Sequence, residues 1–179
     1  ESQPETVAEK AKVMVEHFHT SVAHKIGGEA RCMICTVGIE RAIDYFYEVN
    51  RLLEERHSQY KAIVAFSGEY NYHGVKVDEY KLNGFPSSQI EKTIRSGMYR
   101  FLIVADKFQT GYDEPLLHTM YVDKPLHGLQ TVQTLSRLNR CCKGKVDTFV
   151  LDFANSAETI RASFQPFFED TWLGEDVDV

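Results

Sequence analysis

The sequence lacks the features that would place the protein in a membrane or outside the cell. No apolar run in its 179 residues approaches the roughly 20 residues that a bilayer-spanning helix needs, and its first residues lack the charged and apolar regions of a signal peptide. Four cysteines are too few for a disulfide scaffold in a chain of this length. We therefore expect no membrane contact and a reducing, cytoplasmic compartment.

Basic residues are also in deficit. The chain has 20 Lys and Arg against 26 Asp and Glu, so its net charge is 20 minus 26, or −6. This balance argues against a broad basic surface for nucleic acid, and any such contact has to be local. Much of the acidity lies in residues 169–179, which we expect to form a frayed end or the start of a following segment.

The sequence also lacks a phosphate-binding loop. Nowhere does it contain GxxxxGK[ST], nor the acidic strand end that binds magnesium after such a loop. No paired carboxylates with a nuclease-like lysine stand out either. These absences exclude a complete ATPase within the chain and leave no candidate nuclease centre.

The cysteines could suggest a zinc site, because Cys32 and Cys35 form a CxxC and Cys141 and Cys142 form a further pair. The first pair lies inside the apolar segment RCMICTV, which is typical of a strand. Residues three apart in a strand point to opposite faces. We therefore predict core cysteines and no metal site in this chain.

The order of elements alternates between helix and strand, which predicts a parallel sheet with helices on both faces. Glycines and polar clusters separate the segments, and the stretch between 69 and 86 is irregular and aromatic, so we expect it to be a mobile loop. The expected strands are Arg31–Val37, Lys61–Phe66, Arg100–Ala105, His118–Val122 and Asp147–Asp152, and the expected helices are Glu5–His24, Ile39–Arg56, Ser87–Gly97, a helix containing Gln130–Arg140, and Ala157–Phe168.

The segment QTVQTLSRLNR carries the most informative pattern. On a helix, Gln133, Arg137 and Arg140 fall at i, i+4 and i+7 and share one face. Two guanidinium groups aimed the same way suit a phosphate, because each can bind it in a bidentate manner. The alternative is a solvated helix face beside Asp123 and Asp147.

The loop after the strand Arg100–Ala105 adds polar groups where open α/β sheets bind ligands. Gly111 permits a tight turn in this loop. Asp113 can accept hydrogen bonds from a ribose, and Thr110 can donate one to a backbone phosphate.

These two segments resemble motifs V and VI of the second RecA-like domain of superfamily 2 helicases and translocases. Motif V corresponds to Ala105–Pro115 and motif VI to Gln133–Arg140. Within that superfamily the chain is most similar to the R (restriction) subunit of type I restriction-modification enzymes, on four segments: QTGYDEP, YVDKPL, SRLNR and VLDF. The resemblance extends from the first helix to about Ala162. It implies a RecA-like helicase domain over residues 1–168, with residues 169–179 as an acidic tail.

The resemblance implies one half of a prokaryotic motor that uses ATP and Mg²⁺ to move along double-stranded DNA. A preceding RecA-like domain of the same chain would supply the phosphate loop and magnesium ligands, and modification and specificity subunits would complete the enzyme. Arg140 would be the arginine finger, with Arg137 as its partner and Gln133 orienting them. Gly111 and Asp113 would contact the nucleotide.

The ends of the first two strands are the candidate DNA contacts, together with Thr110. Thr36 with Gly38, and Ser67 with Gly68, each pair a hydroxyl with a backbone amide that can hold a phosphate. Ordinary capping and turn chemistry is the alternative. Related R subunits often have a Ser-Arg pair where this chain has Gly38 and Ile39, so one candidate phosphate-binding arginine is missing.

Two other functions remain open on the sequence. The first is another superfamily 2 motor, such as a repair helicase or a chromatin-type remodeller. The second is a non-catalytic α/β module that binds a small anion or a partner protein, in which Arg137 and Arg140 are surface charges.

Overall fold

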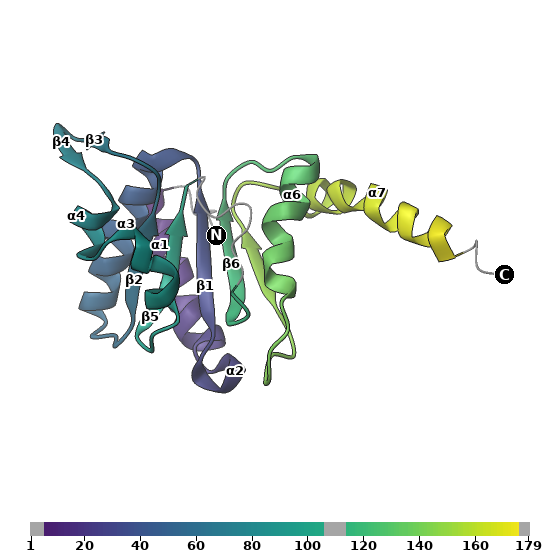
Figure 1. Cartoon of the computed structure of the whole chain (residues 1–179), viewed down its shortest axis with the longest axis horizontal. Helices are drawn as coiled ribbons and strands as arrows, with labels where there is room; N and C mark the ends of the chain where they lie inside the picture. Colours follow the sequence, from purple (N-terminus) through teal and green to yellow (C-terminus); the bar gives the residue numbers. More distant parts are fainter. Residues whose placement is uncertain (1–5, 106–113, 176–179) are drawn as a thin grey trace.

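The computed structural model describes residues 6–105 and 114–175. Its centre is a five-stranded sheet in the order β2-β5-β1-β6-β7, and every pairing is parallel. The predicted parallel sheet is therefore confirmed, with helices on both sides (Figure 1). The strands are β1 (Arg31–Thr36), β2 (Lys61–Ala65), β5 (Tyr99–Val104), β6 (Leu117–Asp123) and β7 (Phe149–Asp152).

Two long helices cover one face of the sheet. They are α1 (Val7–His17), which begins with a capping box between Thr6 and Glu9, and α3 (Gly38–Glu55). Their apolar stripes pack on alternate residues of the strands, as the helical periodicity predicts. The largest buried members of this core include Met14, Phe18, Ile43, Tyr45, Phe101 and Tyr121.

The helices α5 (Ile90–Ile94), α6 (Gly128–Leu135) and α7 (Ala157–Glu175) lie on the other face. In β1, Cys32 packs into the first core and Cys35 into the second, and both are buried. This arrangement confirms the prediction that residues three apart in the strand point to opposite faces. Burial raises the pKa of both thiols, to about 12 for Cys35.

The first helix is more complex than the predicted span 5–24. After His17 the chain forms a π-helical turn, Phe18–Val22, and then a short α2 (Lys25–Gly28), in which Ile26 has a φ of +50°. A π-helix has a wider turn than an α-helix. Phe18 and Val22, four residues apart in this turn, are both fully buried, so the turn still presents one face to the core.

The segment predicted to be a mobile loop has regular structure instead. It contains an antiparallel hairpin, β3 (Tyr70–Tyr72) with β4 (Val75–Val77), and the helix α4 (Glu79–Asn83), followed by a 3-10 turn at Ser87–Gln89. The hairpin turn is possible because His73 and Gly74 both have positive φ, +48° and +84°. The Asn83 side chain also bonds the N–H and the C=O of Val64 in β2, at 2.9 and 2.7 Å.

The C-terminal helix also differs from its prediction. Its backbone continues to Glu175, past the expected end at Phe168, so the proposed boundary between domain and tail falls within one helix. In Figure 1 this helix runs away from the sheet toward the C-terminus. Across the described ranges, no helix has both the length and the apolar content that a membrane crossing needs.

Candidate functional site

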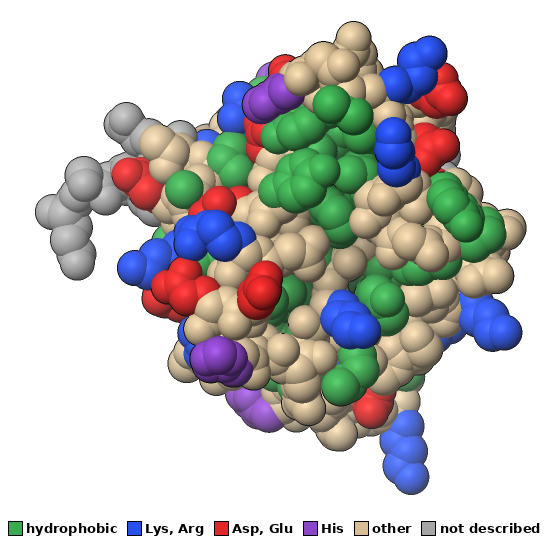
Figure 2. Space-filling view, turned by 90° about the vertical axis from the view of Figure 1, so that its left-hand side faces the viewer, with side chains coloured by type: hydrophobic (Ala, Val, Ile, Leu, Met, Phe, Trp, Pro, Cys, Tyr) green, Lys and Arg blue, Asp and Glu red, His purple; other side chains and the backbone are tan. Residues whose placement is uncertain are grey.

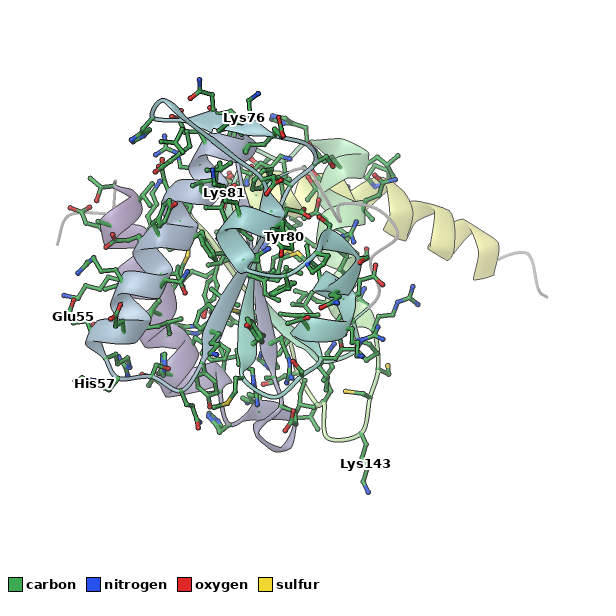
Figure 3. The ribbon with its side chains drawn as sticks, turned by 60° about the vertical axis from the view of Figure 1, so that its left-hand side comes forward. Glu55, His57, Lys76, Tyr80, Lys81 and Lys143 are labelled. Atoms are coloured by element: carbon green, nitrogen blue, oxygen red, sulfur yellow. The ribbon has the colours of Figure 1, made fainter. Side chains whose placement is uncertain are left out.

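The predicted site residues lie toward two opposite ends of the sheet. Because all strands are parallel, Thr36, Gly38, Ser67 and Gly68 follow strands that end at the same edge. The helix α6 then runs back along the sheet (Figure 1). Arg140 follows this helix in the chain and precedes β7, so it lies toward the edge where β7 begins. Figure 3 shows this separation, with Lys76 of the hairpin at one end and Lys143, in the turn before β7, at the other.

Three predicted residues, Thr110, Gly111 and Asp113, lie outside the described residues. The residues on either side of them are described. Ala105 follows β5 at the C-terminal edge of the sheet, and Glu114 precedes β6 at the N-terminal edge. The motif V segment therefore connects the two ends at which the other predicted residues lie.

The turn after β1 offers backbone rather than side-chain groups. The Thr36 hydroxyl is buried and donates to the carbonyl oxygen of Val104, at 3.2 Å. The helix α3 has 18 residues, and its positive end lies at this edge of the sheet. Its N-cap residue, Val37, makes no side-chain hydrogen bond to the backbone amides of the first turn. Gly38 has a φ of +70°, and open space lies where a side chain would stand. A ligand could approach this backbone closely. After β2, Ser67 and Gly68 are both exposed.

A groove of about 770 Å³ lies beside this turn. It lies at the ends of the neighbouring strands β1 and β6, where the chain connections lead in opposite directions. From β1 the chain goes on to β2 at one edge of the sheet, and from β6 it goes on to β7 at the other. Ligands of open α/β sheets bind at such a switch point. The groove is lined by Thr6, Val7, Ala8, Lys10, Val37, Arg41, Asp44, Asp123, Pro125 and Ala154.

The charges in the groove are only partly neutralised. Asp123 accepts hydrogen bonds from Lys10 at 3.1 Å and from the Tyr45 hydroxyl at 2.6 Å. Burial, and then the bond to Asp123, raises the pKa of Tyr45 well above its usual value. Arg41 is 51% exposed and lies 4.0 Å from Asp44, so its pairing is weak. Arg41 is thus the cation most open to a ligand among these groups.

Sequence reasoning missed Lys10 and Arg41. Arg41 lies three residues after Gly38, within the first turn of the helix that follows the first strand, and a basic residue at that place was an available signal. No comparable signal existed for Lys10, which reaches the groove from a different helix.

The prediction that Gln133, Arg137 and Arg140 share one helix face is wrong. The α-helix ends at Leu135, and a 3-10 turn, Ser136–Asn139, follows it. A 3-10 helix has about three residues per turn rather than 3.6, so the side chains after Leu135 point in other directions than they would if the α-helix continued. Gln133 and Arg140 are exposed, whereas Arg137 is 8% exposed and its charge acts on the Cys35 thiol.

Arg140 lies at a separate, smaller cavity of about 250 Å³. Lys145 lines this cavity, and its side chain donates to two carbonyl oxygens, that of Arg140 at 2.7 Å and that of Pro115 at 3.2 Å. The cavity is lined by Leu138, Asn139, Arg140, Cys141, Lys145, Val146, Asp147 and Thr148. Within residues 6–105 and 114–175, no cluster of three or more His, Cys, Asp or Glu side chains could hold a metal ion.

Residues 69–155 match the model of the type I restriction enzyme subunit R domain 3, T1R_D3-like. By this match, residues 69–155 are similar to the type I restriction enzyme R-subunit family, and we call them the R-subunit segment. The R-subunit segment includes the hairpin, the motif VI helix and Arg140. A stretch of 79 residues is 33% identical to the type I restriction enzyme HindI endonuclease subunit of Haemophilus influenzae. That match covers 42% of this chain and 8% of the relative, so the chain spans a small part of the relative's length.

Solved structures place the R-subunit segment within a helicase-type RecA-like fold. The C-terminal domain of the DEAD-box protein Dbp5 has a TM-score of 0.52 and 12% identity, and the match covers 91% of this chain and 80% of that domain. The ATP-dependent type ISP restriction-modification enzyme LlaBIII bound to DNA has a TM-score of 0.53 and 11% identity, with 89% and 12% coverage. At these identities the likeness establishes the fold.

Proposed function

We propose that this chain is the second motor domain of an ATP-dependent double-stranded DNA translocase, within the R subunit of a type I restriction enzyme. The observation that carries the proposal is the position of Arg140, which lies on an open cavity inside the R-subunit segment. The chain lacks a phosphate loop, so the first RecA-like domain of the same parent chain supplies it. The parent acts in the cytoplasm of a prokaryote with modification and specificity subunits.

The described residues suit one side of a nucleotide cleft. Arg140 is exposed and extended in backbone conformation, so its guanidinium can reach the terminal phosphate of an ATP held by the other domain. Arg137 is buried in the turn just before Arg140 and supports that turn from within the domain. Gln133 is exposed and orients the phosphate. Gly111 and Asp113 contact the ribose side. We assign the Mg²⁺ ligands mainly to the first RecA-like domain, which also supplies the phosphate loop.

The opposite end of the sheet suits the DNA backbone. The first-turn amides of α3 at Gly38, the turn Ser67–Gly68 and the hydroxyl of Thr110 are the proposed phosphate contacts. Arg41 adds a charged contact in the adjacent groove. The Thr36 hydroxyl shapes the turn from inside. Figure 2 shows scattered Lys and Arg side chains on the face beside the hairpin, which agrees with contacts that are local.

The motif V segment provides the connection between the two ends. In the chain it follows β5, which ends at the edge with the proposed DNA contacts, and precedes β6, which begins at the edge near Arg140. Hydrolysis that opens and closes the cleft would therefore be transmitted to the DNA contacts through this segment. Alternating grip by the two domains would then move the enzyme along the duplex.

The test is DNA-stimulated ATP hydrolysis by the full-length parent chain, wild type against Arg140→Ala. We expect hydrolysis to fall by ~10³ or more with ATP binding retained, the scale of arginine fingers. Lys143→Ala is the control, because Lys143 is exposed in the neighbouring turn and points away from the body (Figure 3). Unchanged hydrolysis in Arg140→Ala would remove the proposal. So would micromolar nucleotide binding by the isolated chain, because the division of labour predicts weak binding.

A further inference from the structure

Lys145 occupies a position that neither the motifs nor the fold explains. Its ammonium group donates to two carbonyl oxygens that are far apart in sequence, that of Pro115 at 3.2 Å and that of Arg140 at 2.7 Å. Burial lowers the pKa of Lys145, and the nearby Cys142, Cys141 and Glu114 oppose that shift. A lysine that is partly desolvated to reach two main-chain acceptors is different from an ordinary solubility residue.

One of the two segments is held firmly to the body of the domain. Glu114 is buried and bonds Arg95 at 2.6 Å, and its other oxygen accepts from the N–H of Leu116 at 3.1 Å. The carbonyl of Leu116 accepts from the N–H of Arg31, at 2.9 Å. The carbonyl of Pro115 accepts from Cys142 as well as from Lys145, at 3.5 Å. Residues 114–116, where the chain leaves motif V, are thus held in place, and we call them the motif V exit.

The other segment, residues 140–148, has no regular helix or strand and needs contacts to hold its shape. At its far end Asp147 bonds His118 at 2.8 Å and Lys25 at 2.9 Å. Gly144 packs near the backbone of Ile26. These contacts fix the segment on both sides of Lys145, at Gly144 and at Asp147. The hydrogen bonds from Lys145 to the carbonyl oxygens of Arg140 and Pro115 link the arginine itself to the motif V exit.

We propose that Lys145 is a positioning residue that fixes the main chain of Arg140 relative to the exit of motif V. The inference rests on the proposed function of Arg140. Through Lys145, the main chain at Arg140 and the main chain at Pro115 move as one unit when the cleft closes. A lysine suits this role because its flexible stem presents three donors, enough for both carbonyls.

The experiment measures DNA-stimulated ATP hydrolysis by the full-length parent chain in four variants: Arg140→Ala, Lys145→Met, Lys145→Arg and the double variant Arg140→Ala with Lys145→Met. Methionine keeps much of the length and loses the donors, whereas arginine keeps charge and donors. We expect Lys145→Met to lower kcat by roughly 10²-fold, the cost of misplacing a reacting group by about 1 Å, with little change in KM for ATP. Lys145→Arg should recover most of the rate.

The double variant separates positioning from a general structural role. If Lys145 acts through Arg140, the double variant hydrolyses ATP no more slowly than Arg140→Ala alone. A further loss in the double variant would overturn the inference, and so would full activity of Lys145→Met. Lys143→Met is the matched control, with the same change two residues away on an exposed side chain. If Arg140→Ala itself leaves hydrolysis unchanged, the proposed function fails, whereas failure of Lys145→Met alone removes only this inference.

Discussion

The carboxylate of Glu114 is buried and lies 2.6 Å from Nε of Arg95, whose side chain is half exposed. This pair joins the exit of motif V to the chain just after α5, which packs against the second core. The segment that leads into β6 therefore begins from a fixed point.

Replacing Glu114 by Gln tests this contact. The amide keeps the shape of the side chain but weakens its bond to Arg95, so we expect the free energy of unfolding to fall by about 1–2 kcal/mol. Urea unfolding measures the change, and Glu91→Gln on the exposed side of α5 is the control. Equal stability of the two variants would show that the bond adds nothing to the fold.

Thiol alkylation tests the placement of the four cysteines. Cys141 is exposed and Cys142 half-buried, whereas Cys32 and Cys35 are buried. We expect iodoacetamide to modify Cys141 first and Cys142 more slowly, and to reach the other two only after unfolding, because burial also raises the pKa of those thiols. Mass spectrometry of digested protein identifies each site. Early modification of Cys32 or Cys35 would contradict the two-core arrangement.

The pH dependence of stability should depend on His17. Its Nδ1 lies 2.7 Å from the Tyr121 hydroxyl, and its ring stacks on Phe149. Burial, and then the nearby His118, lowers the pKa of His17 below 6.5. The folded state therefore binds a proton less readily than the unfolded state. Stability from this group is complete above pH 6.5 and is lost as the pH falls through the folded pKa.

The variant His17→Asn keeps a hydrogen-bonding group near the position of Nδ1 and does not titrate. We expect its free energy of unfolding to change less between pH 7 and the acid range than that of the wild type. His19, whose pKa burial also lowers, should account for part of the remaining slope. His127→Asn, an exposed site, is the control. A slope unchanged by His17→Asn would show that His17 is not neutral in the fold.

Arg41 should contribute to DNA binding through a phosphate contact. We expect Arg41→Ala in the full-length parent chain to weaken duplex binding similarly for all sequences and to reduce the slope of log K against log salt by about 1. Arg51→Ala is the control on the same helix, because Arg51 already pairs with Glu48 and Glu55. Fluorescence anisotropy at several salt concentrations measures both. Equal slopes for the two variants would exclude Arg41 from the interface.

Much of the fold could be predicted because its signals are local. Apolar runs predicted the ends of the five strands to within one or two residues. Period-two alternation within β1 predicted that Cys32 and Cys35 point to opposite faces of the sheet, and they pack into different cores. The hairpin was missed because its strands are only three residues long and carry polar residues. The two-residue turn His73–Gly74 was the available signal.

The site was harder to predict because its geometry depends on tertiary contacts. The face shared by Gln133, Arg137 and Arg140 assumed that one helix continues to the end of the motif, and the change to a 3-10 turn at Ser136 is not visible in the pattern. Lys10 and Arg41 come together only because α1 and α3 pack side by side on the sheet. Nucleotide and DNA contacts remain predictions at every proposed residue.

The strand order has a consequence for synthesis of the chain. β5 lies between β1 and β2, so these first two strands of the sheet do not pair with each other. Until residues 99–104 have left the ribosome, both remain apolar segments without a sheet partner. A nascent or truncated chain that stops before Tyr99 would therefore expose two apolar segments with unpaired backbone groups. Chaperone binding during translation would protect such a chain from aggregation.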